Sequence, residues 1–175
     1  MNTHHLSISR AGLFAAVLAL TGFGVGQAFA QSTELPGRKD PVPGLTTAGQ
    51  PSADQLAAVA KSGIKTVIDL RGLAEDRGMD ERATVEKLGM SYVTLPVEGG
   101  NGVTYANATA LDKLLANAKG PVLVHCATGN RAGALLALRD KLKGADNDSA
   151  LAFGVASGLT GLKPAVEKKL EQGHD

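Results

Sequence analysis

Short apolar segments alternate with amphipathic segments along most of the chain. The apolar segments are rich in β-branched residues and are bounded by glycine or proline, a pattern typical of buried strands. They predict strands at Ile64–Leu70, Met90–Leu95 and Pro121–Val124.

Apolar residues in the intervening segments recur at helical spacing. Ser52 and Gln55 match a capping box, which predicts a helix start, and Gly63 follows the expected end at Lys61. Helices are expected at 52–61, Glu81–Leu88, Ala106–Ala118, Asn130–Lys143, Ser149–Gly158 and Pro164–Gln172.

This alternation predicts an α/β fold with a mostly parallel central sheet flanked by helices. In such sheets ligands bind at the carboxyl ends of the strands. The segment from Cys126 to Asn130 lies between a predicted strand end and a predicted helix start, so we expect the site there.

The N-terminal 30 residues have the pattern of a secretory signal peptide. A weakly basic start precedes an apolar run, and Ala28-Phe29-Ala30 matches a small-x-small cleavage site. Residues 1–30 are therefore expected to be removed during export to the periplasm, which leaves no membrane anchor. Residues 31–44 are expected to form an extended arm, and residues 45–175 a single domain.

Charge and composition make some partners poor candidates. Removal of Arg10 with the leader balances the 18 basic and 17 acidic residues, and aromatic residues make up only 3% of the chain. Without a basic tract or an aromatic platform, nucleic acid is not an expected partner. The sequence does not identify a protein partner. The chain has one cysteine, so no internal disulfide can form.

That cysteine begins a motif with both a nucleophile and an anion-binding side chain. Backbone amides at a helix N-terminus attract anions, and the same field favours the nucleophilic thiolate form of Cys126. Arg131 supplies a planar guanidinium that suits an oxyanion. Between them lie the residues of the expected anion-binding loop: Ala127, Thr128, Gly129 and Asn130. His125 precedes the cysteine, and we expect it to serve through a positioning hydrogen bond.

The chain resembles the protein tyrosine and dual-specificity phosphatase superfamily, and more narrowly the bacterial phosphatase-like domain of beta-lactamase hydrolase-like proteins. The likeness covers about Leu45 to Leu170. It is carried by the motif at Gly120–Cys126, by Gly63–Arg71, which resembles the opening strand, and by Leu95–Val97, which resembles the entry to the general-acid loop. The resemblance implies that Cys126 attacks phosphorus and that Arg131 holds the phosphoryl oxygens.

Three features depart from the phosphatase pattern. Four residues separate Cys126 from Arg131 where the phosphatases have five, and four is the spacing that resembles rhodanese-type sulfurtransferases. Ala132 stands where a serine or threonine normally follows the arginine. The expected acid loop lacks aspartate, which leaves Glu98 as the candidate general acid and Asp69 and Asp76 as possible substitutes.

Other polar residues have simpler interpretations. Asn130 is expected to cap the helix that it begins, and Arg71 to be a solvated charge. The charged residues of the next segment are expected to form a solvated face: Glu75, Asp76, Arg77, Asp80 and Glu81. No cluster with the spacing of a metal site is evident, and no cofactor is expected.

Three functions remain open at this point. The first is a cysteine-dependent phosphatase-like hydrolase acting on a phosphorylated substrate. The second is a sulfurtransferase that carries a persulfide on Cys126. The third is a non-catalytic module that binds a small oxyanion or senses redox state.

Overall fold

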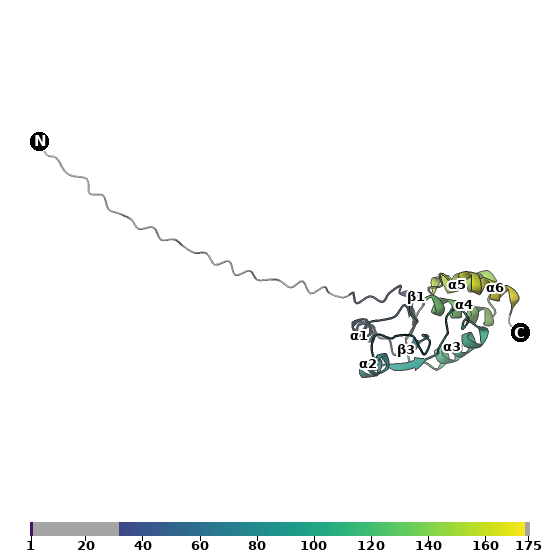
Figure 1. Cartoon of the computed structure of the whole chain (residues 1–175), viewed down its shortest axis with the longest axis horizontal. Helices are drawn as coiled ribbons and strands as arrows, with labels where there is room; N and C mark the ends of the chain where they lie inside the picture. The colour runs from purple at the N-terminus through teal and green to yellow at the C-terminus, as the bar shows by residue number, and fades with distance from the viewer. Residues whose placement is uncertain (2–31, 174–175) are drawn as a thin grey trace. The chain divides into compact units, whose positions relative to one another are not determined.

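The computed structural model describes Met1 and residues 32–173, and the folded part lies within the compact unit Gln31–Asp175 (Figure 1). Apart from Met1, the expected signal peptide lies outside the described residues. In the described part of the chain, no helix has both the length and the apolar character needed to cross a membrane.

A five-stranded sheet lies at the centre of the described unit, in the order β1-β2-β5-β3-β4. Only β1 is antiparallel to its neighbour; the other pairs are parallel. The strands are β1 (Lys39–Val42), β2 (Leu45–Ala48), β3 (Thr66–Asp69), β4 (Ser91–Thr94) and β5 (Val122–His125).

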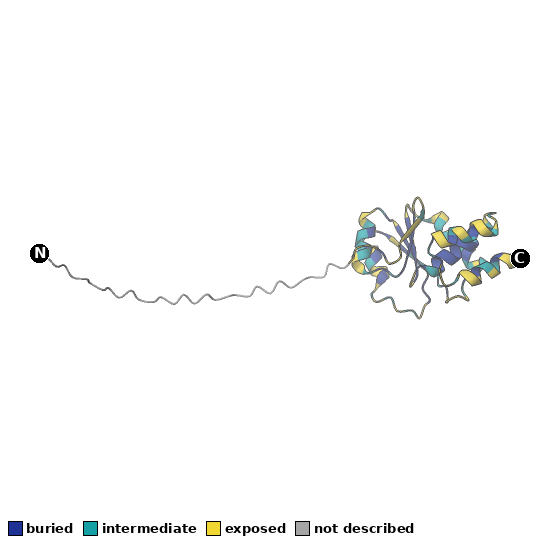
Figure 2. Cartoon of the chain, turned by 90° about the horizontal axis from the view of Figure 1, so that it is seen from above, coloured by how far each residue is buried: buried dark blue, intermediate teal, exposed yellow. Residues whose placement is uncertain are grey.

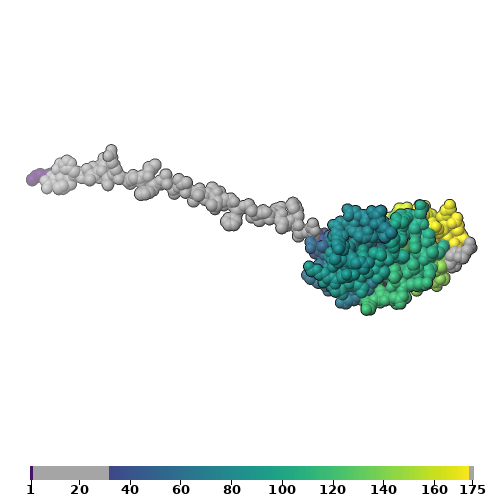
Figure 3. Space-filling view, turned by 60° about the horizontal axis from the view of Figure 1, so that its bottom comes forward, coloured from purple at the N-terminus to yellow at the C-terminus, as the bar shows by residue number. Residues whose placement is uncertain are grey.

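Helices cover both faces of this sheet, with α1 and α2 grouped apart from α4, α5 and α6 (Figure 1). In the space-filling view the early segments and the C-terminal helices lie at opposite ends of the folded unit (Figure 3). The helices are α1 (Ala53–Lys61), α2 (Glu81–Lys87), α3 (Tyr105–Asn117), α4 (Asn130–Leu142), α5 (Asn147–Ala156) and α6 (Lys163–Gln172).

Successive strand residues point to opposite faces and enter separate cores. Val67 and Leu123 pack with α1 and α2 residues, whereas Ile68 and Val124 pack with residues of α3 to α6. Strands β2, β3 and β5 and helix α4 are therefore mostly buried, as the dark ribbon in Figure 2 shows. Burial on both faces explains the continuous apolar runs of the parallel strands.

The mostly parallel α/β architecture predicted from the sequence is confirmed, as is the capping box of α1. The sequence did not predict strands β1 and β2. In β2 two threonines replace apolar residues, and the Thr47 hydroxyl satisfies its polarity by donating to the Ser157 carbonyl at 2.8 Å. β1 contains Pro41 but lies at the sheet edge, where a missing N–H donor is tolerated.

The parallel register brings four strand ends to one edge. Ala48 is paired with His125, His125 with Asp69, and Asp69 with Thr94. The loops that follow these residues begin side by side, and one of them carries Cys126. The sheet therefore positions the expected site.

Candidate active site

The loop after β5 turns tightly around the Cys126 sulfur. Cys126 is buried, and its Sγ accepts a hydrogen bond from the Gly129 N–H at 3.1 Å. Gly129 has a φ of +87°, a left-handed conformation that glycine adopts without steric cost. This turn aims a backbone amide at the sulfur, where it would stabilise negative charge.

The segment after β2 supports the outer side of this loop. Gly49 forms an antiparallel bridge with Thr128, and the Gln50 N–H donates to the Ala127 carbonyl at 3.1 Å. Ala127 and Thr128 are exposed. Two exposed positions of the loop therefore border solvent, while its backbone is fixed to the neighbouring segment.

Arg131 lies in the first turn of α4, and its guanidinium is held by two loops that are distant in sequence. Nη1 donates to the Val97 carbonyl at 2.8 Å, and Nη2 donates to Glu75 Oε2 at 2.7 Å. Nη1 also donates to the other Glu75 oxygen, which completes a bidentate pair. The hydrogen bond that Arg131 donates to Glu75 raises the pKa of Arg131, and interaction with Cys126 contributes in the same direction. The arginine is therefore charged and fixed beside the cysteine.

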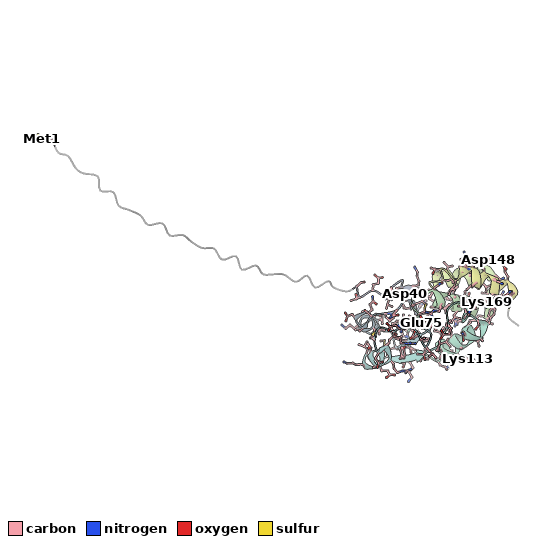
Figure 4. All side chains as sticks on the ribbon, viewed as in Figure 1. Met1, Asp40, Glu75, Lys113, Asp148 and Lys169 are labelled. Atoms are coloured by element: carbon pink, nitrogen blue, oxygen red, sulfur yellow. The ribbon has the colours of Figure 1, made fainter. Side chains whose placement is uncertain are left out.

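Glu75 is a site residue that the sequence analysis missed. It was expected on a solvated face, but its carboxylate binds Arg131, and this hydrogen bond lowers the pKa of Glu75. Figure 4 labels Glu75. It occupies a charged, glycine-containing loop, where a carboxylate bound to arginine has no local sequence signal. Only the approach of this loop to α4 identifies it.

Glu98 lies on the loop between β4 and α3. It directly follows Val97, whose carbonyl binds Arg131, and its Oε1 accepts a hydrogen bond from the Leu73 N–H at 3.2 Å. The side chain packs so closely on Gly72 that a Cβ there would lie 2.4 Å from its Oε2. Glu98 is exposed, so this carboxylate lies at the solvent edge of the Arg131 environment.

Asn130 does not cap α4 as expected, because Gly129 is the N-cap residue and makes no side-chain capping bond. Instead the Asn130 Oδ1 accepts hydrogen bonds from the Thr160 N–H at 2.9 Å and the Leu162 N–H at 3.3 Å. Asn130 therefore links the loop to the segment before α6. Its side chain is committed to that segment.

A buried ionic cluster lies beneath the loop. His125 is fully buried, and its Nε2 lies 2.7 Å from Glu81 Oε1. Arg71 is fully buried as well and donates to both Asp69 and Glu81. The expectations of a solvated Arg71 and Glu81 were wrong, because pairing between opposite charges lets both enter the interior.

Asp69 receives most of the hydrogen bonds in this cluster. Arg71 Nε and Arg77 Nε donate to its two oxygens at 2.9 and 3.0 Å, and the Tyr92 hydroxyl donates at 2.8 Å. Burial alone would raise the pKa of Asp69, but the hydrogen bonds from Arg71 and Tyr92 and the charge of His125 lower it to about 2. Asp69 is thus a structural carboxylate, poorly suited to donate a proton at neutral pH.

Three members of the cluster bring possible metal ligands together. One atom each from Asp69, Glu81 and His125 lies within 4.8 Å of the others, a proximity that the sequence analysis did not anticipate. The Arg71 guanidinium binds both carboxylates and already supplies positive charge there. This arrangement therefore fits an internal ion-pair network better than a divalent cation.

Comparison with known proteins identifies the family of this chain. Residues 41–143, more than half of the chain, match the model of the beta-lactamase hydrolase-like protein, phosphatase-like domain. Beta-lactamase hydrolase-like proteins are 35% identical over 120 residues in Xylella fastidiosa and over 104 residues in Agrobacterium fabrum. These matches cover 66% and 57% of this chain but 28% and 24% of the relatives. The chain therefore spans about a quarter of their length.

Solved structures share the fold. A putative phosphatase from Neisseria meningitidis has a TM-score of 0.64 at 22% identity, covering 74% of this chain and 96% of that one. A cysteine-to-serine variant of TpbA from P. aeruginosa, in complex with pTyr, has a TM-score of 0.59 at 25% identity, covering 78% and 82%. From the match over residues 41–143, this chain belongs to the phosphatase-like domain family of beta-lactamase hydrolase-like proteins.

Proposed function

We propose that this protein is a cysteine-dependent hydrolase of phosphate monoesters. The observation that carries the proposal is the loop from Cys126 to Arg131. It aims the Gly129 amide at the sulfur and places a fixed guanidinium in the adjoining helix turn. A nucleophile and donors for phosphoryl oxygens are thus combined in one loop, within a phosphatase-like family.

In the first step, the Cys126 thiolate attacks phosphorus and forms an S–P bond while the P–O bond of the ester breaks. Arg131 and the loop amides stabilise the charge on the phosphoryl oxygens. The departing oxygen takes a proton from Glu98. Water then attacks the phosphocysteine, Glu98 accepts a proton from that water, and cleavage of the S–P bond releases phosphate and restores the thiolate.

Glu98 is the proposed acid because of its position. It adjoins the carbonyl that binds Arg131, and its side chain is exposed to the solvent from which a substrate would enter. Glu75 has a different role, because its bond to Arg131 lowers its pKa and keeps it ionised. Ionised Glu75 cannot protonate a leaving group; we assign it the orientation of Arg131.

The short loop and Ala132 alter how the thiolate leaves phosphocysteine. Ala132 cannot donate a hydrogen bond to the departing sulfur, and it is fully buried. The Gly129 N–H, at 3.1 Å from Sγ, is the donor that would take this role. A backbone donor cannot be deleted by substitution of a side chain, so this function would persist in most variants of the loop.

We also propose that the protein acts after export, since the leader pattern ends in Ala28-Phe29-Ala30. The substrate would then be a phosphorylated compound of the periplasm.

Hydrolysis by the purified chain tests the proposed chemistry. An aryl phosphate should be hydrolysed, and Cys126→Ser should lower the rate by at least about a thousandfold with an unchanged circular dichroism spectrum. Thiosulfate with cyanide is the parallel assay. Turnover of thiosulfate but not of aryl phosphate would replace this proposal with a sulfurtransferase.

A further inference from the structure

We propose that Arg77 is a positioning residue of this site: it holds Glu75 where Glu75 can orient Arg131. This inference rests on the proposed function, because it assigns Arg131 to oxyanion binding. Arg77 itself contacts neither Cys126 nor Arg131 through any hydrogen bond of the described structure. Its effect would pass through the loop from Gly72 to Glu75.

The Arg77 guanidinium donates hydrogen bonds to backbone carbonyls of that loop. Nη1 donates to the Glu75 carbonyl at 3.1 Å, and Nη2 reaches the Arg71 and Gly72 carbonyls at 3.4 and 3.5 Å. One side chain thus binds three carbonyls within five residues. This segment belongs to no helix or strand, and its one local backbone bond is a turn from the Glu75 N–H to the Gly72 carbonyl at 3.2 Å, so the Arg77 bonds add to the few contacts that place its backbone.

Asp69 anchors the guanidinium to the sheet. Arg77 Nε donates at 3.0 Å to Asp69 Oδ2, which is fully buried at the end of β3. The same carboxylate accepts bonds from Arg71 and the Tyr92 hydroxyl. Arg77 therefore joins the last residue of β3, through Nε, to the loop that carries Glu75, through Nη1 and Nη2.

Glu75 connects the backbone of this loop to the side chain of Arg131. Its Oε1 accepts the Gly72 N–H at 2.6 Å, and its two oxygens bind Nη1 and Nη2 of Arg131. The carboxylate therefore binds the Nη1–Nη2 edge of the Arg131 guanidinium. These bonds use both Nη1 and Nη2, but they leave the Nε–H and the second N–H of Nη2, and this pair could present two parallel donors to an oxyanion.

The sequence of contacts runs from Asp69 through Arg77 and Glu75 to Arg131. If one link is lost, Arg131 keeps its charge but loses the orientation that two-pronged recognition requires. A lysine at position 77 retains a cation for Asp69 but cannot reach three carbonyls together. Arg77→Lys therefore keeps the ion pair with Asp69, which supports folding, but removes the bonds to the carbonyls that place the loop.

Vanadate affinity, measured by calorimetry on the whole chain, tests the proposal through a double-mutant cycle. Arg77→Lys should weaken vanadate binding about tenfold, within the coupling expected for residues in one network. In a Glu75→Ala background, Arg77→Lys should have no further effect, because the link from position 77 to Arg131 is already broken. The melting temperature of each variant reports folding separately.

Arg38→Lys is the matched control, since Arg38 also pairs with a carboxylate, Asp40, but on the edge strand side of the sheet. It should leave vanadate affinity unchanged. Equal affinity in wild type and Arg77→Lys would overturn the inference, as would an equal effect of Arg77→Lys with and without Glu75. Failure of the wild-type chain to bind vanadate would instead remove the proposed function.

Discussion

Glu75 Oε2 lies 2.7 Å from Nη2 of Arg131, although the two residues are 56 positions apart in sequence. The contact joins the loop after β3 to the first turn of α4. It keeps the Arg131 guanidinium charged and in one orientation, and the Glu75 carboxylate makes no hydrogen bond to Cys126 in the described structure. The orientation of Arg131, the proposed anion-binding group, therefore depends in part on a segment that contributes no other group to the proposed chemistry.

Arg131→Lys should lower vanadate affinity by at least about tenfold. An ammonium keeps the charge but cannot bind Glu75 and an oxyanion as a planar two-pronged donor. Calorimetric titration with vanadate measures the effect. Arg139→Lys is the control, because Arg139 lies further along α4 and pairs with Asp112 of α3. Unchanged affinity in Arg131→Lys would mean that this guanidinium does not bind the anion.

Glu98→Gln should slow hydrolysis of alkyl phosphates far more than that of activated aryl phosphates. General acid catalysis contributes about 10²–10⁴-fold, and a poor leaving group needs it most. The ratio of kcat/KM for the two substrate classes is the measurement. Glu171→Gln, an exposed change near the C-terminal end of α6, is the control. A ratio that Glu98→Gln leaves unchanged would exclude Glu98 as the acid.

The stability of the fold should fall in acid because of Asp69. Its pKa is about 2 in the folded chain, below an ordinary value of about 3.9, so its contribution is full above pH 4–5. This contribution, about 2 kcal/mol by linkage, should be lost as the pH falls towards 2. Urea unfolding at a series of pH values would measure it.

Asp69→Asn should remove that part of the pH dependence and lower stability at pH 7, because Arg77 loses its charged partner and Arg71 keeps only Glu81. Asp76→Asn, an exposed change in the loop that follows β3, is the matched control and should retain the acid transition. An identical pH dependence in wild type and Asp69→Asn would contradict the assignment of Asp69 as the anchor.

If the leader is removed during export, the mature chain should begin at Gln31, directly after Ala28-Phe29-Ala30. N-terminal sequencing of the protein recovered from the periplasmic fraction would identify the cleavage point. Replacement of Ala30 by a bulky residue should block processing and leave a longer precursor. A protein that retains Met1 in the cytoplasmic fraction would disprove the signal-peptide interpretation.

Local sequence was sufficient for the elements that carry the cysteine. Apolar β-branched residues followed by a glycine-containing turn predict the β5 strand, the loop and α4, because strand and helix periodicity act over a few residues. The capping box at Ser52 likewise fixed the start of α1. These local features were sufficient to propose Cys126 as the nucleophile and Arg131 as its anion-binding partner.

Tertiary structure alone decided the roles of the charged residues. Glu75, Arg71 and Glu81 have the sequence appearance of a solvated loop, yet one binds Arg131 and two are buried in an ion-pair network. Whether a charge is solvated or paired depends on which opposite charge the fold brings to it, and two of those partners, His125 and Arg131, come from elements distant in sequence. The sequence determined where the proposed nucleophile lies, whereas the packing of distant loops determined which groups bind the arginine beside it.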